Sequence, residues 1–161
     1  MEWEQTTSFD PLSRELADRH YSRQTPGASK FVAPGRCQVL RIMRAGEAKA
    51  VWVARLDGFA KHDWPGHLEC AMFRNEGAGL SSELIRQAIA AGRYKYGDLP
   101  WLTFVKADAV RRKRDPGRCF IKAGFARVGM TKVRNLLAFT LAVSDLPAAA
   151  PARRQTLALF T

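Results

Sequence analysis

Three consecutive residues near the amino terminus carry side chains that can exchange protons with a substrate. His20, Tyr21 and Ser22 supply an imidazole, a phenol and a hydroxyl, which are groups that act as general acids or bases or that orient them. Asp108 adds a carboxylate further along the chain. We therefore predict that His20, Tyr21, Ser22 and Asp108 are catalytic. The alternatives are that His20 is structural and that Asp108 caps a basic turn.

A glycine-containing segment is the second candidate site. Arg74-Asn75-Glu76-Gly77-Ala78-Gly79 lies between an apolar run ending at Phe73 and a helical pattern beginning at Leu80. Glycine lets the backbone turn and lets a ligand approach it closely, and the unpaired amides of a helix N-terminus bind phosphate. The alternative is a turn that binds nothing. The residues predicted to bind a cofactor here are Arg74, Asn75, Glu76, Gly77, Ala78, Gly79, Leu80 and Ser81.

Positive charge is concentrated in two blocks of the chain. The 161 residues include 26 Lys and Arg against 15 Asp and Glu, a net charge of +11. Residues 14–44 hold seven basic and two acidic residues, and residues 106–134 hold ten and two. Such blocks favour a polyanionic partner, although a single basic run is often only solvated surface. The residues predicted to contact nucleic acid are Arg23, Lys30, Arg36, Arg111, Arg112, Lys113, Arg114 and Arg118.

Several classes of protein are disfavoured by composition. Cys37, Cys70 and Cys119 form no close-spaced pair, so neither a disulfide framework nor a zinc motif is predicted. No metal site is expected, although His20 together with the His62-Asp63 pair offers possible ligands. No apolar run approaches the roughly 20 residues that span a bilayer, and no secretory leader is evident. We expect a cytoplasmic protein that does not enter a membrane.

The elements that must position these residues follow from local patterns. A helix is expected from Pro11 to about residue 19, with Asp10 as N-cap, and a long loop over 20–36. Alternation and turn residues predict strands, and a 3.6-residue period predicts a helix capped by Ser81 or Ser82. The further elements expected are strands over 38–43, 49–57, 67–73, 101–105, 125–130 and 135–143, and helices over 80–96 and 116–123. The fold class is mixed α/β (α+β), with a mostly antiparallel sheet in one domain over residues 1–144.

The residues after 144 differ in composition. Residues 145–161 are rich in proline and alanine and lack a strong hydrophobic pattern. We expect this tail to be an appendage, either loose or docked through Leu157–Phe160.

The glycine segment also carries a resemblance to a known family. It matches the pattern Arg/Gln-x-x-Gly-x-Gly/Ala, and its placement, together with Lys122-Ala123-Gly124-Phe125, resembles the GCN5-related N-acetyltransferase (GNAT) superfamily. The resemblance implies acetyl-CoA or a related acyl donor, bound between splayed strands near 67–73 and 101–106. It also reveals a departure, because Phe120, preceded by Cys119, stands where the family has the tyrosine that protonates the leaving thiolate. Phenylalanine donates no proton, so any acid must come from elsewhere.

A narrower resemblance concerns the acceptor. The stretches His20-Tyr21-Ser22, Phe73-Arg74-Asn75-Glu76 and 112–120 leading into Gly124-Phe125 resemble the Mom-like DNA-modification proteins of phages and prophages. That resemblance implies transfer of a carbamoylmethyl-type group to adenine N6 in double-stranded DNA, with protection from restriction. The adenine must be extruded from the duplex to be reached. Aromatic residues that are candidates for stacking on it are Tyr21, Phe31 and Trp64.

Two other functions are compatible with the same residues. One is a CoA-dependent N-acetyltransferase that acts on aminoacyl-tRNA or on a protein amine. The other is a nucleic-acid-binding module that kept the fold and lost catalysis, which the Phe120 departure permits. The chemistry itself is also open, because thioester transfer forms an amide whereas a carbamoylmethyl group is attached through a methylene.

Overall fold

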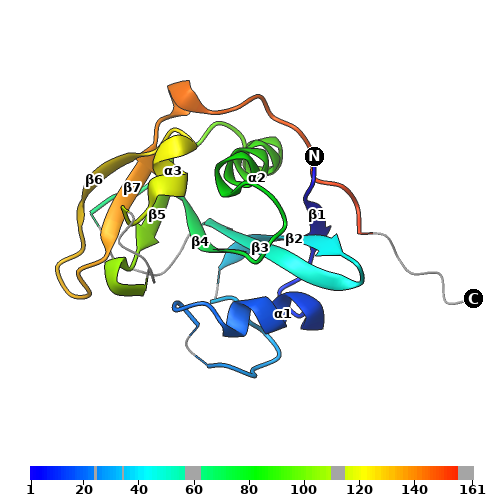
Figure 1. Cartoon of the computed structure of the whole chain (residues 1–161). Coiled ribbons are helices and arrows are strands. Elements are labelled where there is room, and N and C mark those ends of the chain that lie inside the picture. Colours follow the sequence, from blue (N-terminus) through cyan, green and yellow to red (C-terminus); the bar gives the residue numbers. More distant parts are fainter. Residues whose placement is uncertain (24, 34, 57–62, 110–114, 156–161) are drawn as a thin grey trace, which may run out of the picture.

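The computed structural model describes residues 1–23, 25–33, 35–56, 63–109 and 115–155. Within these ranges one seven-stranded sheet has the order β1-β2-β3-β4-β5-β7-β6, with helices on both faces (Figure 1). The strands are β1 (Glu4–Thr6), β2 (Arg36–Arg44), β3 (Glu47–Leu56), β4 (Leu68–Asn75), β5 (Trp101–Val105), β6 (Ala126–Met130) and β7 (Leu137–Leu141). The helices are α1 (Pro11–Asp18), α2 (Ser81–Tyr96) and α3 (Arg118–Lys122), with 3-10 turns at Ala107–Ala109 and Val143–Asp145.

The sheet topology confirms the expected mixed α/β fold with a mostly antiparallel sheet. Each neighbouring pair of strands is antiparallel except β4 and β5, which are parallel. Those two strands pair over three residues, from Leu68 opposite Trp101 to Cys70 opposite Thr103. Beyond that point β4 continues to Asn75 and β5 to Val105, but the two strands share no further registered pairs. The sheet therefore opens where β4 and β5 separate.

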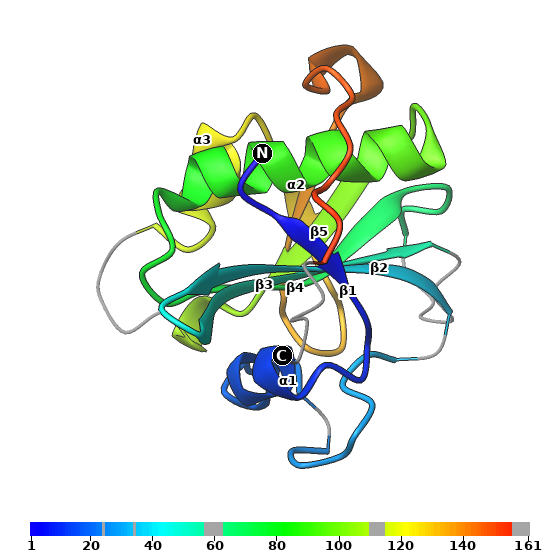
Figure 2. The same cartoon turned by 90° about the vertical axis from the view of Figure 1, so that its right-hand side faces the viewer.

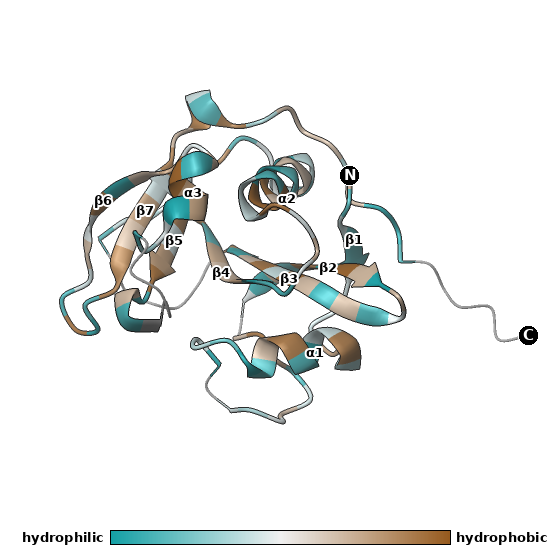
Figure 3. Ribbon diagram, in the orientation of Figure 1, coloured by the Kyte–Doolittle hydropathy of each residue, from teal (hydrophilic) through white to brown (hydrophobic). Residues whose placement is uncertain are grey.

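Two apolar clusters hold helices against opposite faces of the sheet (Figure 2). Trp52 and Trp101 belong to the cluster under α2 and are almost fully buried. Val53 and Met72 belong to the cluster under α1. The strands are apolar on both faces as a result, and hydrophobic residues colour much of β5 and β7 (Figure 3). Burial on two faces fixes the strand positions from which the site is built.

The start of α1 is tied to the sheet by a buried ion-pair group. Asp10 caps the helix, accepting from the amides of Leu12 and Ser13 at 3.3 and 3.1 Å, which confirms the expected N-cap. Arg41 of β2 donates to Asp10 at 3.0 Å and to Glu4 of β1 at 2.7 Å. The side chains of all three charged residues are at most 10% exposed. One guanidinium thus pairs with two buried carboxylates and joins three elements.

Removing that guanidinium is expected to destabilise the fold strongly. Arg41→Met leaves Glu4 and Asp10 buried without a counter-charge, and breaking a buried pair in this way costs about 3–5 kcal/mol. Arg44→Met, at the exposed end of the same strand, removes an ion pair with Glu2 whose side chains are more than 40% exposed. Urea unfolding should show a much smaller loss for Arg44→Met. Equal losses in the two variants would contradict a special role for Arg41.

Several element boundaries differ from the sequence expectation for local reasons. The N-cap of α2 is Leu80, without a side-chain hydrogen bond, so the predicted serine cap is wrong and Ser81 is the first helical residue. The helix α3 is shorter than predicted, and Gly124 follows it at φ 108°, which is the expected left-handed closure. The strand β1 was not predicted because three residues carry too little pattern. It lies at one end of the strand order, beside β2.

The chain after β7 folds back over α2 to the edge of the sheet. The Ala150 amide donates to the carbonyl of Ala90 in α2 at 3.1 Å. Arg153 then joins β1, accepting from the Gln5 amide at 2.7 Å and donating to the Trp3 carbonyl at 2.9 Å. Figure 1 shows this strap passing above α2 towards the amino terminus. The expected appendage is thus docked through residues 146–155, whereas Leu157–Phe160 lies outside the described residues.

Candidate active site

A cavity opens where β4 and β5 separate. Its volume is about 250 Å³, and we call it the strand cavity. The walls come from both strands, from the residues that follow α1, from the start of α2 and from α3. Its lining includes the polar, sulfur-containing and aromatic residues His20, Tyr21, Cys70, Thr103, Cys119 and Phe120. The Thr103 hydroxyl donates to the Cys70 carbonyl at 3.1 Å, which closes the last paired position before the strands part. The cavity is therefore a product of the short β4–β5 register.

The glycine segment forms an open loop between β4 and α2. Asn75 shapes it, accepting from the Ala78 amide at 2.9 Å and donating to the Gly79 carbonyl and the Ser81 hydroxyl at 2.8 and 3.0 Å. Gly77 and Gly79 have φ values of 93° and 153°, where side chains are disfavoured. A Cβ at Gly77 would meet no described atom within 4 Å. The space beside Gly77 is therefore open in the part of the chain that the structure describes.

The amides at the start of α2 are available to a ligand. The first intrahelical acceptor is used by Leu84, whose amide donates to the Leu80 carbonyl at 3.0 Å. The amides of Ser81, Ser82 and Glu83 precede it, and the first turn of a helix has no intrahelical acceptors for them. No side-chain cap covers them. These donors, at the positive end of the helix dipole, suit an anion such as a phosphate.

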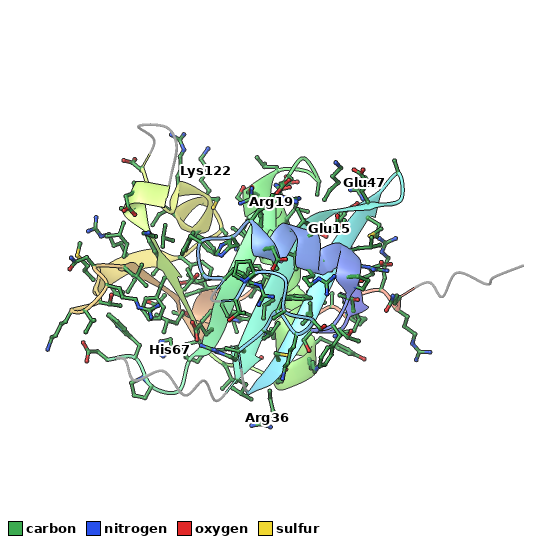
Figure 4. The ribbon with its side chains drawn as sticks, turned by 90° about the horizontal axis from the view of Figure 1, so that it is seen from below. Glu15, Arg19, Arg36, Glu47, His67 and Lys122 are labelled. Carbon is green, nitrogen blue, oxygen red and sulfur yellow. The ribbon has the colours of Figure 1, made fainter. Side chains whose placement is uncertain are left out.

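Two of the predicted cofactor residues form a clamp to α1. Glu76 accepts from Arg19 at 3.0 and 3.1 Å and also from Arg74. Arg74 in turn donates to the Arg19 carbonyl at 2.9 Å. The hydrogen bond from Arg19 is the main cause of a lowered pKa at Glu76. Arg74 and Glu76 therefore fix the glycine loop against the end of α1, where Arg19 is seen from below in Figure 4.

The structure brings His20, Tyr21 and Ser22 together beside the strand cavity. The rings of His20 and Tyr21 stack with centroids 4.3 Å apart. Ser22 donates from its amide to Nδ1 of His20 at 3.1 Å, and its hydroxyl lies 2.7 Å from the same nitrogen. The Tyr21 hydroxyl donates to the Phe104 carbonyl at 2.9 Å. Nδ1 of His20 is thus an acceptor within the triplet, and the proton of the neutral ring therefore lies on Nε2.

Burial sets the protonation of both rings. It lowers the pKa of His20 to about 4, with the Arg74 charge acting in the same direction. It raises the pKa of Tyr21 to about 12. At neutral pH the imidazole is therefore neutral and able to accept a proton, and the phenol keeps its proton. At that pH the imidazole can accept a hydrogen bond and the phenol can donate one.

We expect the imidazole of His20 to titrate well below its usual range. The neutral form should persist as the pH falls through 6.5 and should be lost only near pH 4, because the buried cation is disfavoured. An NMR titration of the histidine ring signals, assigned with a His20→Gln variant, measures this. A His20 midpoint at or above pH 6 would contradict the burial argument. Any acid limb of activity carried by His20 should lie equally low.

The helix α3 presents Cys119 and Phe120 to the same cavity. Phe120 is buried, with its ring edge-on to Phe73 and Phe125 at 6.2 and 5.4 Å. Cys119 is half-buried, and burial raises the pKa of its thiol. Neither side chain is a ready acid, whereas the Tyr21 hydroxyl lines the same space. Tyr21 is therefore the candidate proton donor at this point.

A larger cavity adjoins the first. It has a volume of about 1330 Å³, and we call it the loop cavity because described residues of the loop between Tyr21 and Ala33 form one wall. The strand cavity and the loop cavity share Tyr21, Cys70, Ala71, Met72 and Phe104 in their walls. Basic side chains outnumber acidic ones around it, with Arg23, Lys30, Arg55, Lys106, Lys132 and Arg134 against Asp63 and Glu69. The two cavities therefore meet at a junction beside the catalytic candidates.

The other predicted residues lie at varied distances from this junction. Arg23 pairs with Asp18 at 2.6 Å and donates to two carbonyls of its own loop, so its guanidinium is engaged within the loop. Asp108 is exposed, 3.9 Å from Lys106, and lines neither cavity. Lys30 lines the loop cavity, whereas Arg36 and Arg118 are exposed outside it. Arg111, Arg112, Lys113 and Arg114 lie outside the described residues.

The stacking candidates and possible metal ligands separate in the same way. Tyr21 and Trp64 line the loop cavity, and the Trp64 ring packs edge-on to Phe104 at 6.0 Å. Phe31 also lines it but is 3% exposed and belongs to the core under α1. His62 lies outside the described residues, and within those described no group of three His, Cys, Asp or Glu side chains is placed to hold a metal. None of the described helices is long and apolar enough to cross a bilayer.

Sequence reasoning missed the floor of the loop cavity. Val53 of β3 pairs with Met72 and Ala54 pairs with Cys70, so Ala71 is an extra residue in β4. This β-bulge re-aims the strand at the junction of the cavities. Arg55 and Glu69 sit beside it as a cross-strand pair. The sequence does show opposite charges in two adjacent strands, which is a signal for such a pair. That Arg55 lies opposite Glu69 depends, however, on the register that the bulge sets.

Comparisons with known proteins establish the fold. No protein-family model and no curated protein sequence matches the chain. Among solved structures, the aminoglycoside acetyltransferase AAC(6')-Ib in complex with ribostamycin and coenzyme A aligns over 89% of this chain and 94% of its own, with 17% identity and a TM-score of 0.64. An acyl-CoA N-acyltransferase from Pseudomonas aeruginosa aligns over 87% and 98%, with 17% identity and a TM-score of 0.58.

A third similar structure is a chimera of the Vibrio cholerae spermidine N-acetyltransferase SpeG and hSSAT. It covers 91% of this chain and 98% of its own, with 12% identity and a TM-score of 0.60. At these identities the likeness is one of fold. The chain has the α/β fold of the GNAT acetyltransferases, as the glycine-loop resemblance predicted.

Proposed function

We propose that this protein is an acyl-CoA-dependent transferase that places a small acyl-derived group on the exocyclic N6 of adenine in DNA. The observation that carries the proposal is the junction of the two cavities at Tyr21, Cys70 and Phe104. On one side lies an open, amide-rich glycine loop, and on the other a chamber lined mainly by basic side chains. A phosphorylated donor and a polyanionic acceptor thereby have separate entrances to one point.

The donor side fits a coenzyme A thioester. The amides of Ser81, Ser82 and Glu83 would hold its phosphates, and the space at Gly77 lets them approach the backbone. The strand cavity would receive the arm that bears the acyl group. When bound, an acyl-CoA supplies that group in activated form as a thioester. The structures of AAC(6')-Ib with coenzyme A, which have the same fold, support this use of the cleft.

The residues at the junction can move the two protons that such a transfer requires. Nδ1 of the neutral His20 ring can accept the proton that the amine loses by way of the Ser22 hydroxyl, which lies 2.7 Å from it. Nε2 already carries the ring proton, because Nδ1 accepts from the Ser22 amide. The Tyr21 hydroxyl can supply a proton to a leaving thiolate, because its raised pKa keeps it protonated. An adenine amine is a weak nucleophile, so a positioned base is needed. Phe120 gives no such help.

The acceptor side favours DNA over the amines named for the similar structures. Those structures are of enzymes named for aminoglycosides and spermidine, which are cationic near neutral pH. Six basic and two acidic side chains line the loop cavity here, and such a wall repels polycations and attracts phosphates. The sequence resemblance to Mom-like proteins adds the adenine and a role in masking DNA from restriction. A thioester donor leaves an N6-acyl amide, so the carbamoylmethyl-type group that the resemblance implies would require a donor attacked at a methylene carbon.

A panel of acceptors tests the proposal. The purified protein is incubated with acetyl-CoA and, in turn, duplex DNA, duplex DNA built without adenine, spermidine and aminoacyl-tRNA, and release of free thiol is measured. We expect thiol release with adenine-containing DNA and at least tenfold less with DNA lacking adenine. Release with spermidine or aminoacyl-tRNA instead would reassign the protein to the N-acetyltransferases of those amines. Tight DNA binding without release would favour a binding module.

A further inference from the structure

A buried ion pair forms part of the floor of the loop cavity. Arg55 of β3 and Glu69 of β4 face each other across the strands, and Nη2 of Arg55 donates to Oε2 of Glu69 at 2.8 Å. Their side chains are 12% and 14% exposed. Both line the loop cavity, and Glu69 immediately precedes Cys70 at the junction. The pair therefore lies beside the point where the transfer would occur.

The hydrogen-bonding capacity of the pair is incompletely satisfied. Nε of Arg55 is buried and has no hydrogen-bond partner among the described residues. An unpaired buried guanidinium N–H is costly, whereas a carboxylate has acceptor capacity on both oxygens. Paired charges that merely stabilised the sheet would have no need of the cavity wall. A ligand that offers an acceptor to Arg55 and a donor to Glu69 would complete the hydrogen bonds of the pair.

We propose that Arg55 and Glu69 recognise the base edge of the acceptor, as an adjacent donor and acceptor for an amino-substituted ring. Adenine offers an amino donor beside a ring-nitrogen acceptor, so Glu69 accepts from the N6 amino group and Arg55 donates to the neighbouring nitrogen. Guanine and thymine place a carbonyl oxygen where adenine has the amino group. That oxygen would face the Glu69 carboxylate, acceptor against acceptor. The pair thus selects an amino base and orients N6 towards the junction.

The other charged and aromatic residues of the loop cavity suit parts of the DNA other than the base edge. Of the other basic residues of the loop cavity, Arg23 is held by Asp18, whereas Lys30, Lys106 and Lys132 carry exposed side chains, which suit phosphates rather than a base edge. Trp64 and Tyr21 supply aromatic surfaces in the same cavity, which suit the faces of a base. Arg55 and Glu69 are the described cavity residues that combine burial with opposite charge. This inference rests on the proposed function and specifies its acceptor subsite.

The test removes one ring nitrogen from the substrate and one guanidinium from the protein. DNA is prepared by polymerase copying with adenine, 7-deazaadenine or 1-deazaadenine at every adenine position, and the modified nucleosides are quantified by mass spectrometry. The wild type should lose about 10- to 100-fold in rate on one of the two analogues, the range expected when a hydrogen-bonded edge is lost. On DNA with ordinary adenine, Arg55→Met should be slower than the wild type by a similar factor. Replacing adenine by that analogue should then lower the rate of Arg55→Met by less than about threefold.

Two further variants keep the result interpretable. Arg55→Met combined with Glu69→Met removes both charges, so that no buried carboxylate is left alone, and it should fold and show the same insensitivity to the analogue. Lys132→Met, in the wall of the same cavity, should weaken DNA binding while keeping the wild-type sensitivity. Equal sensitivity of wild type and both Arg55 variants overturns the inference and leaves the proposed function standing. Absence of any modified nucleoside with wild-type protein overturns the proposed function, and the inference with it.

Discussion

Gly77→Val is expected to weaken coenzyme A binding by at least about 100-fold and to abolish transfer while the protein stays folded. The glycine lies at φ 93° beside the first amides of α2, and no described atom occupies the space that a side chain would fill. A valine there projects into the approach to those amides and strains the turn. Displacing a bound reactant by about 1 Å already costs on the order of 100-fold in rate.

A matched substitution separates the loss of binding from the cost of backbone strain. Gly46, in the turn between β2 and β3, has φ 79° and equally open surroundings but lines neither cavity. Gly46→Val should destabilise the fold as Gly77→Val does and should leave coenzyme A affinity, measured by calorimetry, near the wild-type value. Unchanged affinity in Gly77→Val would remove the glycine loop from the donor site.

Tyr21→Phe should lower kcat by about 100- to 10,000-fold, the range over which general acid–base groups contribute. The Tyr21 hydroxyl lines the strand cavity, donates to the Phe104 carbonyl and keeps its proton through a raised pKa. The variant retains the ring that stacks on His20, so donor binding should change little. Tyr94→Phe, on the exposed side of α2, is the control and should match the wild type.

A second substitution distinguishes an acid from a merely structural hydroxyl. Phe120 lines the strand cavity from α3, at the position where the GNAT superfamily, which the sequence resembles, has its tyrosine. Phe120→Tyr introduced into Tyr21→Phe should restore part of the lost rate if the missing element is a proton donor. Activity within tenfold of wild type in Tyr21→Phe would show that the thiolate leaves without help from this residue.

The architecture could be predicted because its signals are local. Asp10-Pro11 marks the start of α1, the period from Leu84 to Ile89 marks α2, and the apolar run at Trp101–Val105 marks a central strand, as the structure confirms. The turn before Glu47 likewise has Ala45 and Gly46 at positive φ, as a tight hairpin requires. Each of these depends on residues a few positions apart, which a single sequence displays.

The rest depended on contacts between distant segments. Arg23 looks like a free cation in the sequence, but Asp18 holds it in the structure. Arg153 joins β1 across nearly the whole chain, although the composition predicted an appendage that is either loose or docked through Leu157–Phe160. The floor pair of Arg55 and Glu69 appears only once the bulge at Ala71 sets the register. Partner choice of this kind is decided by tertiary packing, and periodicity does not encode it.

The mass of the nucleosides in cellular DNA tests whether the protein modifies adenine, because a cell supplies whatever donor the protein uses. Genomic DNA is digested from cells that express the wild type, Gly77→Val or the double variant His20→Ala, Tyr21→Phe, each at matched protein levels. We expect a modified deoxyadenosine with the wild type and none with either variant. Unmodified deoxyadenosine in cells that contain folded wild-type protein, alongside acetylated tRNA or polyamine, would contradict it.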